Sequence, residues 1–164
     1  MLGMRQVLRR GTAFCLGFGA LLTAHTASLA DPGREWTTFS DERGTRVQYP
    51  SDVFSLKENI TRGRTFITED GRATLQVYSG PNEHGETPAQ ALRRTLAQKR
   101  SRLTYDRVAR NFFAISARHN NQILYRRCNF HREMVHCIDL TYPISEKRNW
   151  DYTVTRISRS LRPL

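Results

Sequence analysis

The segment CNFHREMVHC, residues 128–137, constrains the fold of this chain more than any other stretch. Two cysteines bracket two histidines, so the segment suits a metal site, a redox centre or a covalent link across a hairpin. A two-residue turn at Arg132 and Glu133 would place Cys128 opposite Cys137 in a non-hydrogen-bonded pair, whose Cα atoms lie about 4.5 Å apart. That separation falls within the range of roughly 4.4 to 6.8 Å found in disulfides. The spacing therefore favours a disulfide across an antiparallel hairpin.

The two histidines of this segment do not favour the metal interpretation. Side chains alternate between the two faces of a strand, so His131 and His136 would point away from the face that carries the cysteines. The segment also lacks the two close ligand pairs of a typical zinc motif, and it contains no redox CxxC. The Arg–Glu turn lacks the Gly or Asn that tight hairpins favour, but a four-residue turn through residues 131–134 keeps the same pairing. We predict a Cys128–Cys137 disulfide and no metal site.

The first 30 residues have the pattern of a secretory signal peptide. Three arginines precede the apolar run AFCLGFGALLTA, which is too short to span a membrane, and Ser28 and Ala30 suit a cleavage site. An uncleaved anchor is the alternative. Cleavage would remove Cys15 and leave residues 31–164 as a single domain in the periplasm or outside the cell. Such compartments oxidise cysteine pairs, which favours the disulfide.

Apolar residues alternate with polar ones in several short segments, as they do in half-buried strands. Residues 36–49 predict two strands around a glycine turn, and the polar residues 56–63 are expected to form a connection. Residues 64–80 predict a hairpin with an Asp-Gly turn. Residues 112–142 predict an antiparallel meander with a turn at residues 119–121.

The segment TPAQALRRTLAQKR predicts a helix that begins after Thr87. Thr87 and Gln90 have the spacing of a capping box, and Pro88 suits the first helical position. The residues expected to face the core are Ala89, Leu92, Leu96 and Leu103.

The C-terminal segment SEKRNWDYTVTRISRSLRPL predicts a second helix, with Ser145 as its cap. Its apolar residues recur at helical spacing, although its threonine and valine content leaves a strand as the alternative. This apolar stripe consists of Trp150, Val154, Ile157 and Leu161.

The order of these elements predicts an α+β fold in which an antiparallel β-sheet is flanked by two main helices. The segments RVQYPSDVF, the EDG hairpin, the helix after Thr87, DLTYP and the terminal RISRSLRP together resemble the PsbP-like fold. That α/β/α sandwich occurs in small exported bacterial proteins and in the PsbP proteins of the thylakoid lumen. The resemblance implies binding or accessory roles more than catalysis. It transfers no binding residue, because no functional motif of the family matches here, and a fold alone does not fix a function.

The chain is strongly basic, with a formal net charge of +11, and arginine supplies most of the positive charge. A basic surface attracts anions such as envelope polymers, lipid headgroups, nucleic acid or acidic proteins; a solvated surface without a partner is the alternative. We expect the helix after Thr87 to bind an anionic envelope component or a protein partner, and export disfavours nucleic acid. The candidate anion-binding residues are Arg93, Arg94, Lys99 and Arg100.

Two further arginine clusters follow the basic run that extends from Arg93 to Arg110. The sequence cannot tell whether the three clusters share a face, and a shared face would favour anion binding. The second cluster is Arg126 and Arg127, and the third is Arg156, Arg159 and Arg162.

Catalytic motifs are sparse. The sequence contains no nucleophile elbow G-x-S-x-G and no glycine-rich phosphate loop, and its adjacent carboxylates lie in expected turns. We therefore predict no catalytic residue and no cofactor. A small envelope hydrolase that uses His84 or His119 of the expected loops is one alternative function, and a purely structural stabiliser is another.

Overall fold

The computed structural model describes residues 33–60, 63–97 and 102–164. The predicted signal peptide lies outside the described residues, and so do two of the predicted anion-binding residues, Lys99 and Arg100. The described residues belong to one compact unit. No helix among them has the length and apolar character needed to cross a membrane.

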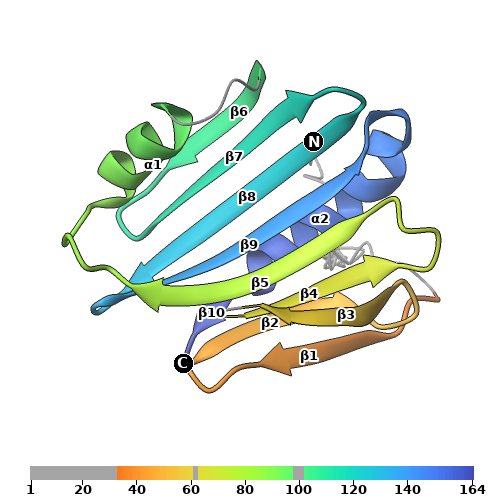
Figure 1. The fold of residues 1–164 in the computed structure, drawn as a ribbon, viewed down its shortest axis with the longest axis horizontal. Helices are drawn as coiled ribbons and strands as arrows, with labels where there is room; N and C mark the ends of the chain where they lie inside the picture. The colour runs from red at the N-terminus through yellow and green to blue at the C-terminus, as the bar shows by residue number, and fades with distance from the viewer. Residues whose placement is uncertain (1–32, 61–62, 98–101) are drawn as a thin grey trace, which may run out of the picture. The chain divides into compact units, whose positions relative to one another are not determined.

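The strands of the described residues form two antiparallel sheets (Figure 1). The larger sheet has seven strands in the order β3-β4-β5-β9-β8-β7-β6, and the smaller has three in the order β1-β2-β10. The seven strands are β3 (Phe54–Ile60), β4 (Gly63–Thr68), β5 (Thr74–Pro81), β9 (Met134–Pro143), β8 (Gln122–His131), β7 (Phe112–His119) and β6 (Arg102–Val108). The three are β1 (Trp36–Ser40), β2 (Thr45–Pro50) and β10 (Arg162–Pro163).

The hairpin of β8 and β9 has the predicted register. Cys128 lies opposite Cys137, and His131 lies opposite Met134 at the turn. Arg132 supplies the turn conformation that Gly or Asn would normally provide, since its φ is +52°. The structure contains the Cys128–Cys137 disulfide, with the two Cα atoms 4.1 Å apart. The prediction of a two-residue turn with cross-strand cysteines is confirmed.

Both edges of the seven-stranded sheet differ from the sequence prediction. The segment 56–63, which we expect to form a connection, belongs largely to the edge strand β3. At the other edge, Leu103, which we assign to the buried face of the helix after Thr87, belongs to the strand β6. Each edge strand pairs on one side only, and both are interrupted by a bulge. Edge strands carry charged residues and bulges because they must not pair with other chains. Because β3 and β6 lack alternating apolar residues, the sequence pattern did not predict them as strands.

The helix α1 (Pro88–Ala97) begins with the predicted capping box. The backbone N–H of Thr87 donates to Gln90 Oε1 at 2.8 Å, and the N–H of Gln90 donates to Thr87 Oγ1 at 3.3 Å. The predicted buried face is only partly correct. Leu92 is buried, but Leu96 and Leu103 are each 37% exposed, because α1 ends at Ala97 and Leu103 lies on β6.

The C-terminal helix α2 (Lys147–Ser160) begins later than predicted. A short 3-10 turn, η1 (Ile144–Glu146), precedes it, so Ser145 is not the cap, and Glu146 occupies that position without a side-chain capping bond. The predicted apolar stripe is confirmed. Val154, Ile157 and Leu161 are buried.

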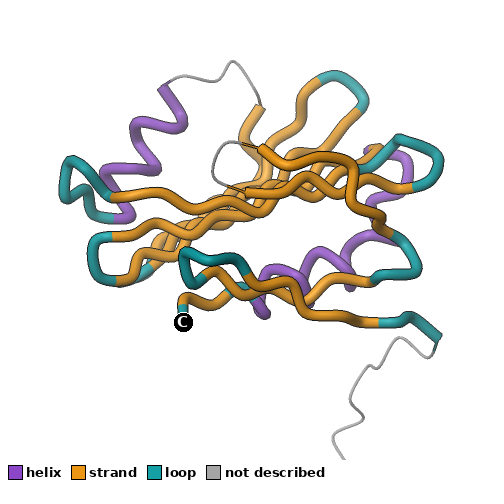
Figure 2. The backbone as a smooth tube through the Cα atoms, turned by 60° about the horizontal axis from the view of Figure 1, so that its bottom comes forward, coloured by secondary structure: helices purple, strands orange, loops and turns teal. Residues whose placement is uncertain are grey.

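The two helices lie on opposite sides of the seven-stranded sheet (Figure 2). The helix α2 and the three-stranded sheet lie side by side on the same side of it, and Ser160 of α2 is hydrogen-bonded to the backbone of Gln48 on β2. The main core joins α2 to the inner faces of both sheets through Ile157, Val47 and Ile138. A second, smaller core lies under α1, where Leu92 contacts Phe113 and the disulfide. The predicted α+β architecture is therefore confirmed, with the three-stranded sheet as an additional element beside α2.

Candidate anion-binding site

A pocket of about 270 Å³ lies between α2 and the strands β6, β7 and β8. Three arginines from distant parts of the sequence line it, namely Arg107, Arg127 and Arg159. No aspartate or glutamate is among its lining residues in the described part of the chain. We refer to it as the arginine pocket.

The register of the sheet brings two of these arginines together. Arg107 of β6 and Arg127 of β8 both pair with Ala114 of β7, from its two sides. Directly paired residues share a face of the sheet, so the two arginines flank a small side chain in one row. Neighbouring strands lie about 4.8 Å apart, which places the two Cα atoms roughly 10 Å from each other. The small alanine between them leaves room for a ligand.

The third arginine is supplied by α2, which the sheet holds firmly. Tyr125 Oη of β8 and Ser158 Oγ of α2 are hydrogen-bonded at 2.7 Å. Ser158 is buried, and Arg159 follows it on the exposed side of the helix. The position of Arg159 at the rim of the pocket is therefore set by the packing of its neighbour.

Two contacts hold Arg127 in place before any ligand binds. Its Nε donates to Asn129 Oδ1 at 2.9 Å, and its guanidinium lies 3.9 Å from the centroid of the Phe112 ring. Asn129 is itself held, because its Nδ2 donates to the backbone oxygen of Leu161 at 2.8 Å. The guanidinium of Arg107 lies 5.6 Å from the same ring. These contacts use the Nε of Arg127 and leave its terminal nitrogens for a ligand.

The electrostatics of the arginine pocket favour an anionic ligand. Burial lowers the pKa of Arg127, and the nearby charge of Arg107 lowers it further. Both effects oppose the charged form, yet an arginine stays protonated in proteins. Within the described residues no carboxylate forms an ion pair with Arg107, Arg127 or Arg159. A bound anion would supply the missing counter-charge.

Comparison with known proteins identifies the fold. No family model matches the chain, and no curated protein matches it. The solution structure of cyanobacterial PsbP (CyanoP) from Synechocystis sp. PCC 6803 superimposes with a TM-score of 0.60 over 85% of this chain and 99% of that chain. The chain has a PsbP-like fold. At 12% sequence identity this likeness concerns the fold alone, and it confirms the resemblance seen in the sequence.

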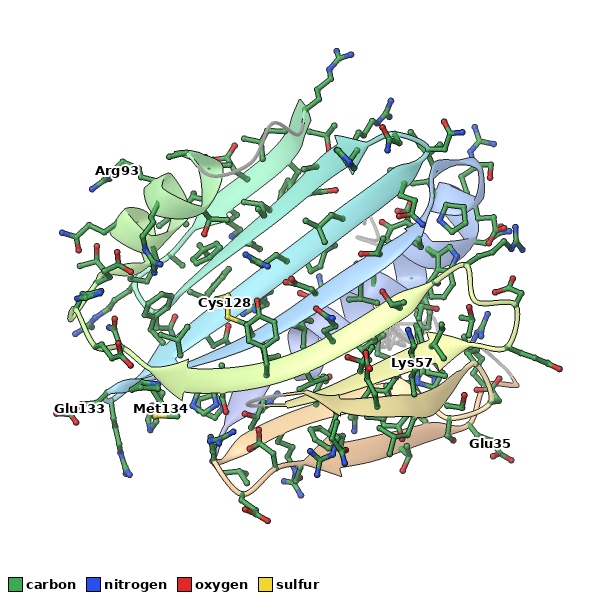
Figure 3. The ribbon with its side chains drawn as sticks, viewed as in Figure 1. Glu35, Lys57, Arg93, Cys128, Glu133 and Met134 are labelled. Carbon is green, nitrogen blue, oxygen red and sulfur yellow. A yellow bond between two sulfur atoms is a disulfide. The ribbon has the colours of Figure 1, made fainter. Side chains whose placement is uncertain are left out.

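The predicted anion-binding residues lie elsewhere in this PsbP-like domain. Arg93 and Arg94 belong to α1, on the face of the sheet opposite the arginine pocket, and Figure 3 shows Arg93 on that helix. Arg94 forms an ion pair with Glu86, with an Nε–Oε1 distance of 2.9 Å. Lys99 and Arg100 lie outside the described residues. A binding role for these four residues remains a prediction.

The sequence did contain a signal for the arginine pocket. Each of the three basic clusters contributes one member: Arg107 comes from the first, Arg127 from the second and Arg159 from the third. Alternation along β8 separates the second cluster, because Arg126 points to the opposite face and pairs with Asp139. Only the topology shows which member of each cluster reaches the pocket.

A second pocket, of about 390 Å³, lies on the α1 side of the sheet and contains the disulfide (Figure 3). Its arginines are already neutralised, since Arg94 pairs with Glu86 and Arg126 pairs with Asp139. This pocket therefore has less uncompensated positive charge for an anion than the arginine pocket has.

The same pocket is lined by the loop residue His84, one of the two histidines named in the hydrolase alternative. Ser79 also lines it, but its Oγ donates to Asp41 Oδ2 at 3.3 Å and the residue is only 1% exposed. Among the described residues no group of three or more His, Cys, Asp or Glu side chains could hold a metal ion.

Proposed function

We propose that this PsbP-like domain is a non-enzymatic binding module that holds an anionic group of its ligand between Arg107, Arg127 and Arg159. The observation that carries the proposal is the convergence of three cations on one pocket whose described lining residues include no carboxylate. Guanidinium groups bind sulfate, phosphate and carboxylate through paired N–H donors. Tyr125 and Ser158 beside them would limit the size of the group that enters.

The proposed setting is the periplasm or the exterior of the cell, where the domain would serve an accessory role. The signal-like first 30 residues and the disulfide support this setting. The proposed partner is an anionic component of the envelope or an acidic protein, and the proposed interaction needs no cofactor. Arg93, which is exposed on α1, is a second contact in this proposal, whereas Glu86 already neutralises Arg94.

The test is a titration of the purified domain with sodium sulfate at constant ionic strength, followed by backbone amide NMR. A hydrogen bond to a charged group contributes about 1.5–3 kcal/mol, so Arg127→Gln should weaken sulfate binding roughly 10- to 100-fold. Arg159→Gln should act in the same direction, and it changes an exposed residue whose loss leaves the core intact.

The matched control is Arg148→Gln, which removes the same charge from an exposed position of α2 that does not line the pocket. It should leave the dissociation constant within about twofold, because exposed charges are screened by salt. The variant Arg93→Gln measures how much the α1 surface contributes to sulfate affinity in the same assay. Wild-type affinity in both Arg127→Gln and Arg159→Gln would refute the proposed function.

A further inference from the structure

A second basic pocket occurs on the outer face of the three-stranded sheet. Arg46 of β2 lies directly opposite Arg162 of β10 in the antiparallel register. Like charges in directly opposed positions destabilise a strand pair. The two arginines therefore do not contribute to folding stability, which suggests a role in binding. The two arginines line a pocket of about 430 Å³ together with Thr38, Gln48 and Ser160. We refer to it as the outer pocket.

The outer pocket also lacks negative charge. None of its described lining residues is an aspartate or glutamate, and neither Arg46 nor Arg162 has an ion-pair partner within the described ranges. Its other side chains carry hydroxyl and amide groups, which donate and accept hydrogen bonds. The chemistry of this pocket is that of a second anion site surrounded by neutral polar groups.

The C-terminal end of α2 connects the outer pocket to the arginine pocket. Arg159 lines the arginine pocket, whereas its neighbour Ser160 lines the outer pocket. Arg162 follows Arg159 by three positions, so their Cα atoms lie no more than about 11 Å apart. The end of α2 is fixed to β2, because the backbone N–H of Gln48 donates to Ser160 Oγ at 2.8 Å. The two pockets therefore have a set spacing.

We infer that the ligand is a linear acidic polysaccharide, with one anionic group in the arginine pocket and a second in the outer pocket. This inference rests on the proposed function and adds the class of ligand to it. Two linked sites turn the second contact into an intramolecular event, which raises the affinity for a chain that spans both. A single small anion cannot use that gain.

The aromatic side chains favour a polysaccharide over a single-stranded nucleic acid. Nucleic-acid strands are held by aromatic rings on which successive bases stack. In the arginine pocket the ring of Phe112 is covered by the guanidinium of Arg127, which leaves Tyr105 as the exposed ring, at 45% exposure. The outer pocket offers hydroxyl and amide groups in place of rings, and these groups match sugar hydroxyls.

The experiment compares a heparin disaccharide with a heparin decasaccharide by titration calorimetry at physiological salt. The wild-type domain should bind the decasaccharide at least about 100-fold more tightly, as linked sites do. The double variant Arg46→Gln/Arg162→Gln should lose most of that gain and keep the disaccharide affinity. Its melting temperature should equal or exceed that of the wild type, because the substitution removes a repulsion.

A control double variant, Arg118→Gln/Arg148→Gln, removes two exposed arginines that line neither pocket. An equal loss of decasaccharide affinity in this control would overturn the inference, since net charge alone would then explain binding. An unchanged decasaccharide affinity in Arg46→Gln/Arg162→Gln would also overturn it. In that case a loss of sulfate binding in Arg127→Gln would still uphold the proposed function.

A single-stranded DNA 20-mer provides the last arm. Weak binding of this strand is expected. DNA binding as tight as that of the decasaccharide, with the same loss in Arg46→Gln/Arg162→Gln, would overturn the polysaccharide as the ligand.

Discussion

The disulfide between β8 and β9 allows a quantitative prediction. It closes a short loop, with a sequence separation of 9 between Cys128 and Cys137. The chain-entropy estimate for a loop of that length is about 2.7 kcal/mol at 25 °C. An unfolding entropy of about 2.1 cal/mol/K per residue converts this loss into a fall in melting temperature of about 10 °C for the domain. Breaking the bond should therefore be easy to detect.

The assay is differential scanning calorimetry of the oxidised and the reduced wild-type domain. This comparison keeps every side chain in place, whereas Cys128→Ala/Cys137→Ala also removes the sulfur atoms of two buried residues. The double variant should melt at or below the temperature of the reduced wild type, and reductant should not change it. Equal melting temperatures for the oxidised and reduced wild type, with free thiols proven by mass, would show that the disulfide does not stabilise the domain.

Two further predictions concern buried polar groups. His136 is 2% exposed and its Nδ1 is hydrogen-bonded to Thr45 Oγ1 at 2.9 Å. Burial lowers the pKa of His136, so the unfolded chain takes up a proton that the folded domain resists. Stability should therefore be fully present above pH 6.5 or so and fall as the pH drops below it, and His136→Gln should flatten this dependence in urea melts between pH 8 and 5.5. A profile that is unchanged in His136→Gln would contradict the assignment. Asp139→Asn should cost roughly 2 kcal/mol in the same melts, because it leaves the largely buried Arg126 without its counter-ion. The control Asp151→Asn breaks the exposed pair with Lys147 and should cost less than about 1 kcal/mol; equal costs would contradict the role given to burial.

The parts of the fold that were predictable are those set by local chemistry. The hairpin at residues 128–137 could be derived because a short turn and strict alternation leave one register for the two cysteines. The start of α1 followed from Thr87 and Gln90, which satisfy each other's backbone groups. The stripe of α2 followed from its helical spacing.

The parts that were missed depend on tertiary context. The edge strands β3 and β6 lack the alternating pattern because their residues do not alternate between core and solvent, and all seven residues of β6 are exposed. Ser145 looked like a helix cap, but the chain enters α2 through the turn η1, so the cap falls at Glu146.

The sequence alone could not predict the arginine pocket; it could only raise the possibility that the three basic clusters share a face. Sequence reasoning identified three basic clusters, but the pairing of Arg107 and Arg127 with Ala114 depends on the strand order β6-β7-β8. The high number of basic residues in a short stretch favoured the arginines of α1 as the anion site. In the structure, however, Arg94 pairs with Glu86, whereas Arg127 is half-buried without a counter-ion. A lack of counter-charge, more than the number of arginines in a stretch, points to an anion site.

The measurement that tests this account most directly is NMR of the arginine Nε–Hε signals during a sulfate titration. We expect the signals of Arg107, Arg127 and Arg159 to shift together, with one dissociation constant, while that of Arg94 stays in place because Glu86 holds it. Saturable shifts confined to the arginines of α1, or equal unsaturated shifts for every arginine, would contradict it.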